Sequence, residues 1–397
     1  MRKVLFIAYD FPPCSSVGGS LRSEKFVKYL PQFGWNPSVI ALAHSNSPQQ
    51  EIYPSVERVS SMTPWNRPYH LTPYGWLPKL YQKAKEAMEN ERYDIIYVSC
   101  PPFPQTTMAT SLKKKFGVPL VVDFRDAWSL DPYVEGSLLK KIIYWAIFPT
   151  LEKRVLSFTD GIILNTPSAF TAYQNKYPQL KPRMTMIPNG YDEEDFNNFN
   201  PTVPADRMTL LYCGRFGIGA RDPLLLFKVL TSMLARGRKL SLCIVGDDNP
   251  KLLKHIHELN LENHIRLDGQ KPHCEAVSAM GNCHVLVLYQ EASKSVVTPV
   301  AGKTYEYLRT GRAILAIAPH GNNIDIIREH AKRHECVTDH NIDSIERALE
   351  SLYADWEKGS LNSNNFPNEV FTDQYNRYAI TEKLANYFNI ICDNLRS

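Results

Sequence analysis

The sequence shows little of what marks a secreted or metal-binding protein. Its eight cysteines are scattered, with no CxxC pair and none of the short spacings that are typical of zinc sites. Free thiols without such a framework are usual in a reducing compartment. The sequence therefore favours a cytoplasmic protein that holds no metal ion. The cysteines are Cys14, Cys100, Cys213, Cys243, Cys274, Cys283, Cys336 and Cys392.

Long apolar runs are missing as well. Apart from the amino terminus, the longest covers residues 142–148, far below the roughly 20 residues that a helix needs to cross a bilayer. The apolar run within residues 1–9 is short, and it is followed by Asp10-Phe11-Pro12-Pro13, which offers no signal-peptide cleavage site. We expect a buried first strand there and no membrane-spanning segment.

The excess of positive charge is small. A net charge of +4 is dispersed along the chain, whereas nucleic acid requires a concentrated basic face, so no nucleic acid partner is expected. Two segments combine lysines with aromatic side chains, as anionic lipid surfaces require, but amphipathic packing explains them equally well. Peripheral contact with the inner face of a cell membrane stays open. The residues concerned are Trp65, Tyr69, Tyr74, Trp76, Lys79, Tyr81, Lys83 and Lys85, and then Lys140, Lys141, Trp145 and Phe148.

The chain is long enough for two domains, because 397 residues exceed what one hydrophobic core usually supports. Short apolar runs alternate with segments of helical period, which is the pattern of strand–helix units on a parallel sheet. A turn-rich passage from Pro188 to Pro204 separates two such halves. The expected strands are residues 4–9, 38–42, 95–98, 120–124, 161–164 and 184–187, and then 209–213, 240–245, 265–267, 285–288 and 313–317.

We therefore predict an α/β protein of two doubly wound, Rossmann-like domains, residues 1–190 and 191–371. Ligands of such folds bind outside the carboxyl ends of the strands, so the site is expected in a cleft where these ends face each other. The acidic run Asp192-Glu193-Glu194-Asp195 falls in the linker. We interpret it as a solvated loop and not as a metal site.

Two passages of the first half are candidates for binding. Gly18-Gly19-Ser20 precedes a helix expected to begin near Leu21, and paired glycines let an anion approach both the backbone and the helix N–H groups. The spacing does not match GxGxxG, and a structural turn is the alternative. Asp123-Phe124-Arg125-Asp126 places two carboxylates around an arginine at a strand end. A structural salt bridge is the alternative there.

The second half offers a more complete set of groups. Gly214-Arg215 follows a strand and Arg221 follows six residues later; two guanidinium groups suit a diphosphate, although exposed loop arginines are the alternative. The loop Thr298-Pro299-Val300-Ala301-Gly302-Lys303 enters a helix near Gly302, where backbone N–H groups beside Lys303 form an anion site. Glu306, one turn further, is placed to accept hydrogen bonds from two vicinal hydroxyls of a ribose.

Taken together, these passages resemble the retaining glycosyltransferases of family 4 over nearly the whole chain. The residues that carry the resemblance are Gly18-Gly19, Asp123-Phe124-Arg125-Asp126, Ile187-Pro188-Asn189-Gly190-Tyr191-Asp192, Gly214-Arg215 with Arg221, Ile244-Val245-Gly246-Asp247, and Lys303 to Leu308 followed by Gly311-Arg312. The resemblance implies a GT-B fold whose carboxy-terminal helix, expected at residues 372–397, packs back onto the first domain. It also implies catalysis without a metal or another cofactor.

The resemblance assigns roles to single residues. Arg215 and Arg221 look like the pair that grips the donor diphosphate, with Arg221 standing where the family more often has lysine. Glu306 matches the second glutamate of the E-x7-E motif, which holds the ribose, whereas the first falls at Thr298. Arg125 stands where many members carry a functionally important histidine, and Asp126 is a hypothesis for orienting the acceptor hydroxyl. The remaining expected donor-binding residues are Gly18, Gly19, Gly214, Gly246, Gly269, Gln270, Val300, Ala301, Gly302 and Lys303.

The function that this resemblance implies is transfer of a sugar, from a UDP-sugar above other donors, to a glycan or lipid-linked acceptor in cell-surface polysaccharide biosynthesis. A nucleotide-sugar 2-epimerase would share the diphosphate and ribose sites, but it needs further acid–base groups, of which the sequence shows no obvious set. A non-catalytic nucleotide-sugar binding protein is the other alternative.

Overall fold

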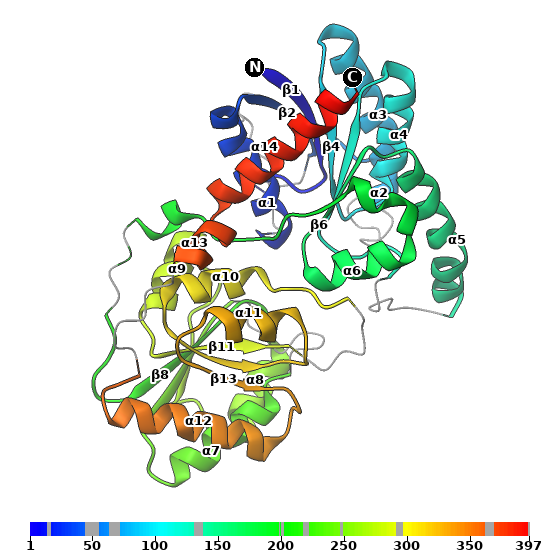
Figure 1. The fold of residues 1–397 in the computed structure, drawn as a ribbon. Coiled ribbons are helices and arrows are strands. Elements are labelled where there is room, and N and C mark those ends of the chain that lie inside the picture. The colour runs from blue at the N-terminus through cyan, green and yellow to red at the C-terminus, as the bar shows by residue number, and fades with distance from the viewer. Residues whose placement is uncertain are drawn as a thin grey trace. The chain divides into compact units, whose positions relative to one another are not determined.

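A computed structural model describes residues 1–13, 17–43, 55–62, 72–130, 138–197, 199, 202–216, 222–246, 249–290, 297–361 and 369–395. The chain forms two compact units (Figure 1). Unit 1 comprises Met1–Asn189, Ser295–Thr298 and Arg377–Ser397, and unit 2 comprises Gly190–Lys294 and Pro299–Asn376. The first boundary therefore falls inside the Pro188-Asn189-Gly190 turn, where Gly190 opens unit 2.

Unit 1 is built on a seven-stranded parallel sheet in the order β3-β2-β1-β4-β5-β6-β7. The six strands expected from apolar runs are present, whereas the short edge strand β3 was not predicted. The strands are β1 (Arg2–Ala8), β2 (Trp35–Leu42), β3 (Val56–Val59), β4 (Ile95–Cys100), β5 (Leu120–Phe124), β6 (Gly161–Leu164) and β7 (Met184–Met186).

Helices cover both faces of this sheet, so its strands are buried on both sides. Leu5 and Ile7 of β1 face a core shared with α3, α4 and α6, while Val4 and Phe6 face the core under α1 and α14. The helices are α1 (Val17–Tyr29), α2 (Thr72–Gly75), α3 (Leu77–Asn90), α4 (Gln105–Phe116), α5 (Leu138–Ser157), α6 (Pro167–Lys176) and α14 (Arg377–Asn394), with 3-10 turns η1 (Leu30–Phe33) and η2 (Pro178–Arg183).

The carboxy-terminal helix differs from the single helix expected at residues 372–397. The structure has α13 (Glu369–Tyr375) in unit 2 and α14 in unit 1, with Asn376 between them. Asn376 forms an isolated β-bridge with Tyr191, and the Tyr191 N–H donates to the Tyr375 carbonyl at 3.0 Å. These contacts fix the backbone between the two helices. α14 then packs on unit 1 beside α1 (Figure 1), where Asn389 accepts hydrogen bonds from Arg2 and Trp35.

Unit 2 contains a six-stranded parallel sheet in the order β10-β9-β8-β11-β12-β13. The five expected strands are present and the edge strand β13 was missed. The strands are β8 (Met208–Cys213), β9 (Leu240–Val245), β10 (Ile265–Leu267), β11 (Val285–Tyr289), β12 (Ala313–Ile317) and β13 (His334–Val337). The two Rossmann-like sheets confirm the predicted fold class.

The helices of unit 2 also form two layers. One core, which includes Leu210, lies under α7, α8 and α12, and the other, which includes Leu211, lies under α9, α10, α11 and α13. The elements are η3 (Glu193–Phe196), α7 (Leu224–Ala235), α8 (Pro250–Glu258), α9 (His273–Gly281), α10 (Gly302–Thr310), α11 (Asn322–His330) and α12 (Ile342–Glu357).

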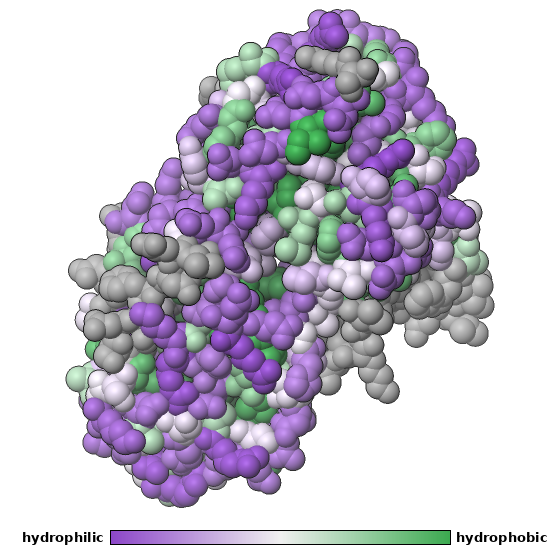
Figure 2. All heavy atoms as spheres, in the orientation of Figure 1, coloured by the Kyte–Doolittle hydropathy of each residue, from purple (hydrophilic) through white to green (hydrophobic). Residues whose placement is uncertain are grey.

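The two lysine and aromatic segments are only partly covered by the described residues. The face drawn in Figure 2 is mainly hydrophilic, with hydrophobic residues in small areas. Trp76 is fully buried and packs edge-on against Tyr9, and Lys83 forms an ion pair with Glu57 at 2.6 Å, so packing accounts for these two residues. Trp65 and Tyr69 lie outside the described residues, as do the side chains of Lys140, Lys141 and Trp145. No described helix is both long and apolar enough to span a membrane.

Candidate active site

The paired glycines of unit 1 lie differently from the prediction. α1 begins at Val17, so Gly18 and Gly19 form its first turn instead of a loop that precedes a helix near Leu21. The backbone before this helix is tied to the edge of the sheet, because Arg58 donates to the carbonyls of Phe11 at 3.2 Å and Pro12 at 2.6 Å. The glycines thus offer the amides of a helix start.

Asp123 forms a buried salt bridge, which is the structural alternative that the sequence left open for this strand end. It is fully buried, and Arg22 of α1 donates to both carboxylate oxygens at 2.7 and 3.1 Å. Tyr97 donates to the same carboxylate, and burial together with Asp123 raises the pKa of Tyr97 well above its usual value. Arg22 also donates to the carbonyls of Ile187 at 2.9 Å and Pro188 at 2.6 Å. The buried pair therefore anchors the turn that leads out of unit 1.

Arg125 and Asp126 follow β5 and point to different surroundings. The Arg125 guanidinium donates to the Pro101 carbonyl at 2.7 Å, and its own carbonyl accepts from Asn165 at 2.7 Å. Asp126 is exposed. Arg125 therefore braces the carboxyl end of β4, whereas Asp126 is the side chain that this strand end presents to solvent.

The loop after Asp126 is fixed by a buried glutamate that the sequence did not single out. Glu152 of α5 has no exposed surface and accepts from the Ser129 amide at 2.8 Å and the Ser129 hydroxyl at 2.7 Å. Tyr173 at 2.8 Å, Tyr177 at 2.6 Å and Lys176 at 2.9 Å complete its contacts. These charge-assisted bonds hold the loop against α5 and α6.

In unit 2, three predicted glycines lie at neighbouring strand ends. Gly214, Gly246 and Gly269 follow β8, β9 and β10, and all three have positive φ angles. The Gly246 N–H donates to the Gly269 carbonyl at 2.9 Å, and a Cβ on Gly246 would lie 2.0 Å from the Gly214 carbonyl oxygen. Only glycine fits at position 246, so the backbone is bare along this edge of the sheet.

Lys303 brings a positive charge to the same edge. Its ammonium group donates to the Cys213 carbonyl at 2.8 Å and lies 3.6 Å from the centre of the Tyr212 ring. Burial raises the pKa of the Cys213 thiol to about 11, and Lys303 opposes that rise. A Cβ on Gly214 would be 3.8 Å from the Lys303 nitrogen, so the ammonium and the bare turn are neighbours. Arg215 is exposed next to this turn, and Arg221 lies outside the described residues.

The loop that enters α10 is held by Asn323, a residue that sequence reasoning missed. This side chain is 3% exposed, and its oxygen accepts from the Ala301 amide at 3.1 Å and the Thr304 hydroxyl at 2.8 Å. Its nitrogen donates to Gln290 at 2.6 Å and the Pro299 carbonyl at 3.3 Å. All four hydrogen-bonding positions of the amide are used. The Ala301 N–H, expected to bind an anion, is therefore already occupied.

Glu306 lies on α10 with its carboxylate bound to His273. The distance from His273 Nε2 to Glu306 Oε1 is 2.7 Å, and His273 Nδ1 lies 3.4 Å from an oxygen of Asp195. The acidic run of the linker is thus no solvated loop. Asp192 is 3% exposed, and Glu193 forms an ion pair with Arg309. The signal that could have pointed to His273 is its position, directly after the loop that begins at Gly269.

Thr298, like the predicted donor residues Gly18 and Gly19, belongs to unit 1. Its N–H donates to the Ser168 hydroxyl of α6 at 2.9 Å, and the neighbouring Val297 belongs to the hydrophobic core of unit 1. Val300 is buried and Gln270 is exposed, both in unit 2. Within unit 2 the structure therefore groups the three strand-end glycines with Lys303, and it places Glu306 beside His273.

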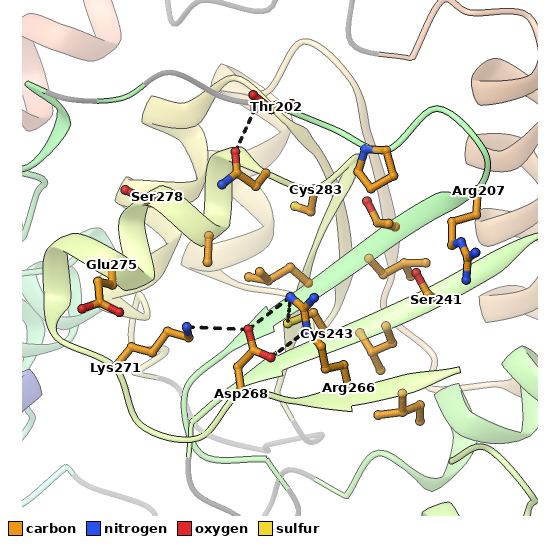
Figure 3. A pocket seen from close by; sticks show the side chains of 18 of the residues that line it. Thr202, Arg207, Ser241, Cys243, Arg266, Asp268, Lys271, Glu275, Ser278 and Cys283 are labelled. Atoms are coloured by element: carbon orange, nitrogen blue, oxygen red, sulfur yellow. Dashed lines mark hydrogen bonds and ion pairs between the residues drawn. The ribbon is translucent and has the colours of Figure 1, made fainter. Parts of the chain in front are cut away.

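A cavity of about 1080 Å³ lies elsewhere in unit 2, along α9 and the adjacent faces of β8, β9 and β10 (Figure 3). Arg266 and Lys271 converge on Asp268 across it, and Arg266 also donates to the Cys243 sulfur at 3.4 Å. None of the predicted donor-binding residues lines this cavity, so the donor is not assigned to it. The described residues contain no group of three or more His, Cys, Asp or Glu side chains that could hold a metal ion.

Comparison with known proteins agrees with these observations. The chain has the two Rossmann-like sheets of the GT-B glycosyltransferases. The model described as Glycosyltransferase Family 4 matches residues 18–195, and the model described as Glycosyl transferases group 1 matches residues 193–383. The chain belongs to the GT-B glycosyltransferases of family 4. No curated protein sequence gives a match.

Solved structures match over the full length of the chain. Sucrose-phosphate synthase from Thermosynechococcus elongatus has a TM-score of 0.75 at 17% identity, covering 99% of this chain and 100% of that one. HepE from Anabaena in complex with UDP and glucose has a TM-score of 0.66 at 16% identity, covering 98% and 100%. A candidate UDP-N-acetylglucosamine 2-epimerase from Listeria monocytogenes has a TM-score of 0.63 at 11% identity, covering 100% and 98%. Similarity at this level of identity shows the fold.

Proposed function

We propose that this glycosyltransferase is a retaining enzyme that takes a sugar from a nucleotide-sugar donor, a UDP-sugar above others. The observation that carries the proposal is the meeting of the bare turns at Gly214 and Gly246 with the Lys303 ammonium at one edge of unit 2. A diphosphate requires close backbone approach and fixed positive charge, and this edge offers both. The first turn of α10, which carries Lys303, adds the N–H groups of a helix start. The UDP held by the structurally similar HepE supports the choice of nucleotide.

The remaining donor contacts are proposed from the family motifs. Glu306 accepts hydrogen bonds from the ribose hydroxyls, and the loop of Gly269 and Gln270 contacts the base through its backbone. Arg215 and Arg221 add charge at the diphosphate. We place Thr298 at the sugar, in the position where the family motif has its first glutamate.

In the proposed reaction the bond between the anomeric carbon and the diphosphate oxygen breaks, the nucleoside diphosphate leaves with the electron pair, and the sugar becomes oxocarbenium-like. Lys303 stabilises the leaving phosphate as its charge grows, without reorganisation, because its ammonium is already held at this edge by the Cys213 carbonyl. In this proposal Arg215 and Arg221 add to the same stabilisation. The acceptor hydroxyl attacks from the face that the phosphate leaves, and a phosphate oxygen takes its proton. No pair of carboxylates at glycosidase spacing is then needed. Asp126 orients the acceptor hydroxyl, and Arg125 supports that strand end.

We further propose that the acceptor is a glycan or lipid-linked sugar, and that the enzyme works in cell-surface polysaccharide synthesis in the cytoplasm, at the inner face of the membrane. The reaction requires no metal ion or other cofactor. The family membership supports these proposals.

The test is a comparison of nucleotides and nucleotide-sugars. We expect UDP to bind more tightly than GDP or ADP in calorimetric titrations, and slow release of free nucleotide from the matching sugar donor, unchanged by EDTA. Lys303→Met is expected to weaken UDP binding about 10-fold, the scale of one charge-assisted contact. Lys239→Met, at an exposed lysine before β9, is the matched control. Equal binding by the two variants would contradict the proposed diphosphate site.

The same experiment separates the alternatives. The structural similarity to the Listeria protein keeps a nucleotide-sugar 2-epimerase as the second candidate. Conversion of one UDP-sugar into its 2-epimer, without free UDP, would support that candidate. Binding of UDP-sugar without either product, over long incubation and with a range of acceptors, would indicate a non-catalytic binding protein.

A further inference from the structure

The proposed ribose-binding carboxylate is one end of a short polar chain. Glu306 of α10, His273 at the start of α9 and Asp195 of η3 come from three separate elements of unit 2. Their side chains are partly sheltered, with 14%, 26% and 19% of their surface exposed. The two contacts, 2.7 Å to Glu306 and 3.4 Å to Asp195, use both nitrogens of the imidazole.

His273 is held in place by its neighbours in the chain. Gly269 turns the backbone after β10 with φ of +67°, and Pro272 then precedes the first residue of α9, which is His273. η3 is fixed at both ends, since its last residue, Phe196, is buried and its first residue, Glu193, pairs with Arg309. The imidazole therefore lies between two carboxylates whose backbones do not depend on it.

The contact leaves half of the Glu306 carboxylate available. His273 binds Oε1, and no hydrogen bond to Oε2 occurs within the described part of the chain. An ionised carboxylate accepts up to about four hydrogen bonds, so Oε1 can serve the histidine while Oε2 receives a ligand hydroxyl. A long glutamate side chain loses rotamer freedom when it binds a ligand, and a prior contact removes part of that cost.

We infer that His273 is a positioning residue: it orients Glu306 through Oε1 so that Oε2 meets the vicinal hydroxyls of the nucleotide ribose, while Asp195 orients the imidazole. This inference rests on the proposed function, because it presupposes that Glu306 binds the ribose. It adds a residue outside the E-x7-E motif to donor recognition.

The decisive experiment compares UDP with 2′,3′-dideoxy-UDP, which lacks both hydroxyls, in calorimetric titrations of the full chain. If His273 acts through Glu306, His273→Ala weakens UDP binding about 5- to 10-fold and leaves dideoxy-UDP binding unchanged, because a single charge-assisted contact is at stake. His273→Gln keeps one N–H donor and is expected to recover most of the UDP affinity. His257→Ala removes an exposed histidine that pairs with Glu262 at 2.9 Å, and it serves as the matched control.

The outcomes separate the inference from the function on which it rests. Equal losses for UDP and dideoxy-UDP in His273→Ala would overturn the positioning role and leave a general structural one. Unchanged UDP binding in that variant would also overturn it. Glu306→Ala tests whether Glu306 binds the ribose at all. If the wild type binds UDP and Glu306→Ala binds it equally tightly, the ribose role of Glu306 is refuted. Wild-type protein that binds no nucleotide would refute the proposed function as a whole.

Discussion

The substitution Gly246→Ala tests the most constrained point of the proposed donor site. A methyl group at this position would lie 2.0 Å from the Gly214 carbonyl oxygen and 2.7 Å from its carbon, and both are backbone atoms that cannot rotate away. Ordinary carbon–oxygen contacts are about 3.3 Å or longer, so the two turns would have to separate by more than about 1 Å. That movement stretches the bond from the Gly246 N–H to the Gly269 carbonyl.

The cost has two parts. A side chain at a φ of +157° is strained by about 1–3 kcal/mol, and the weakened hydrogen bond adds about 1 kcal/mol. We therefore expect Gly246→Ala to lower the free energy of unfolding of unit 2 by about 3 kcal/mol. For a unit of this size, that corresponds to about 6–12 °C in the melting temperature. UDP affinity should fall with it, because the bare turn is displaced.

Gly269→Ala is the matched control, to be measured by calorimetry beside Gly246→Ala. Gly269 also has a positive φ, +67°, but a Cβ there would meet nothing within 4 Å. Only the left-handed backbone is strained, at a cost of about 1 kcal/mol. If the two variants lose the same stability, the close approach of Gly246 to Gly214 does not exist in the protein and the reasoning fails.

Three further predictions concern buried polar groups. Asn323→Ala leaves the Ala301 and Thr304 donors without their acceptor and should weaken UDP binding by about 10-fold, whereas Asn323→Asp keeps the acceptor and should lose less, as titration can show. Glu152→Gln weakens a carboxylate with five donors and should cost about 2–3 kcal/mol in urea unfolding, with UDP affinity unchanged. Burial, with Arg312, lowers the pKa of His284 from 6.5 to about 4, so folding opposes its protonation. Stability should therefore fall by about 3 kcal/mol between pH 6.5 and 4 in wild type relative to His284→Gln, and parallel pH curves would contradict this.

Local patterns were sufficient to predict most of the fold. Buried parallel strands are short continuous apolar runs, and β1, β4, β5 and β11 are buried along their whole or nearly whole length. The edge strands β3 and β13 bury few residues, so they lacked that signal. The break between α13 and α14 has no proline or glycine to mark it. At the break, Asn376 pairs with Tyr191, which lies far away in the sequence.

The candidate site could be predicted only where one segment carries the whole signal. Gly214, Gly246, Lys303 and Glu306 could be proposed because each belongs to a short passage at a strand end or helix start. The residues that hold these groups in place were missed because their contacts span long stretches of sequence. Asn323 accepts a hydrogen bond from Ala301, 22 residues earlier, and His273 contacts Glu306, 33 residues later. No periodicity reports a contact of that kind.

The acidic linker shows how such long-range contacts change the interpretation of a segment. Four acidic residues in a turn-rich passage have, by composition, every property of a solvated loop. Glu193 instead binds Arg309, 116 residues later, and Asp195 meets His273. Both partners belong to helices that flank the proposed nucleotide site, so the linker supplies part of the frame around Glu306. Exchanging Asp195 for Asn should therefore reduce UDP affinity in the way that His273→Ala does, only less, whereas Glu194→Gln, at the adjacent acidic residue, should leave it unchanged. An equal effect of both substitutions would mean that the charge of the run matters, and not the contact of Asp195 with the imidazole.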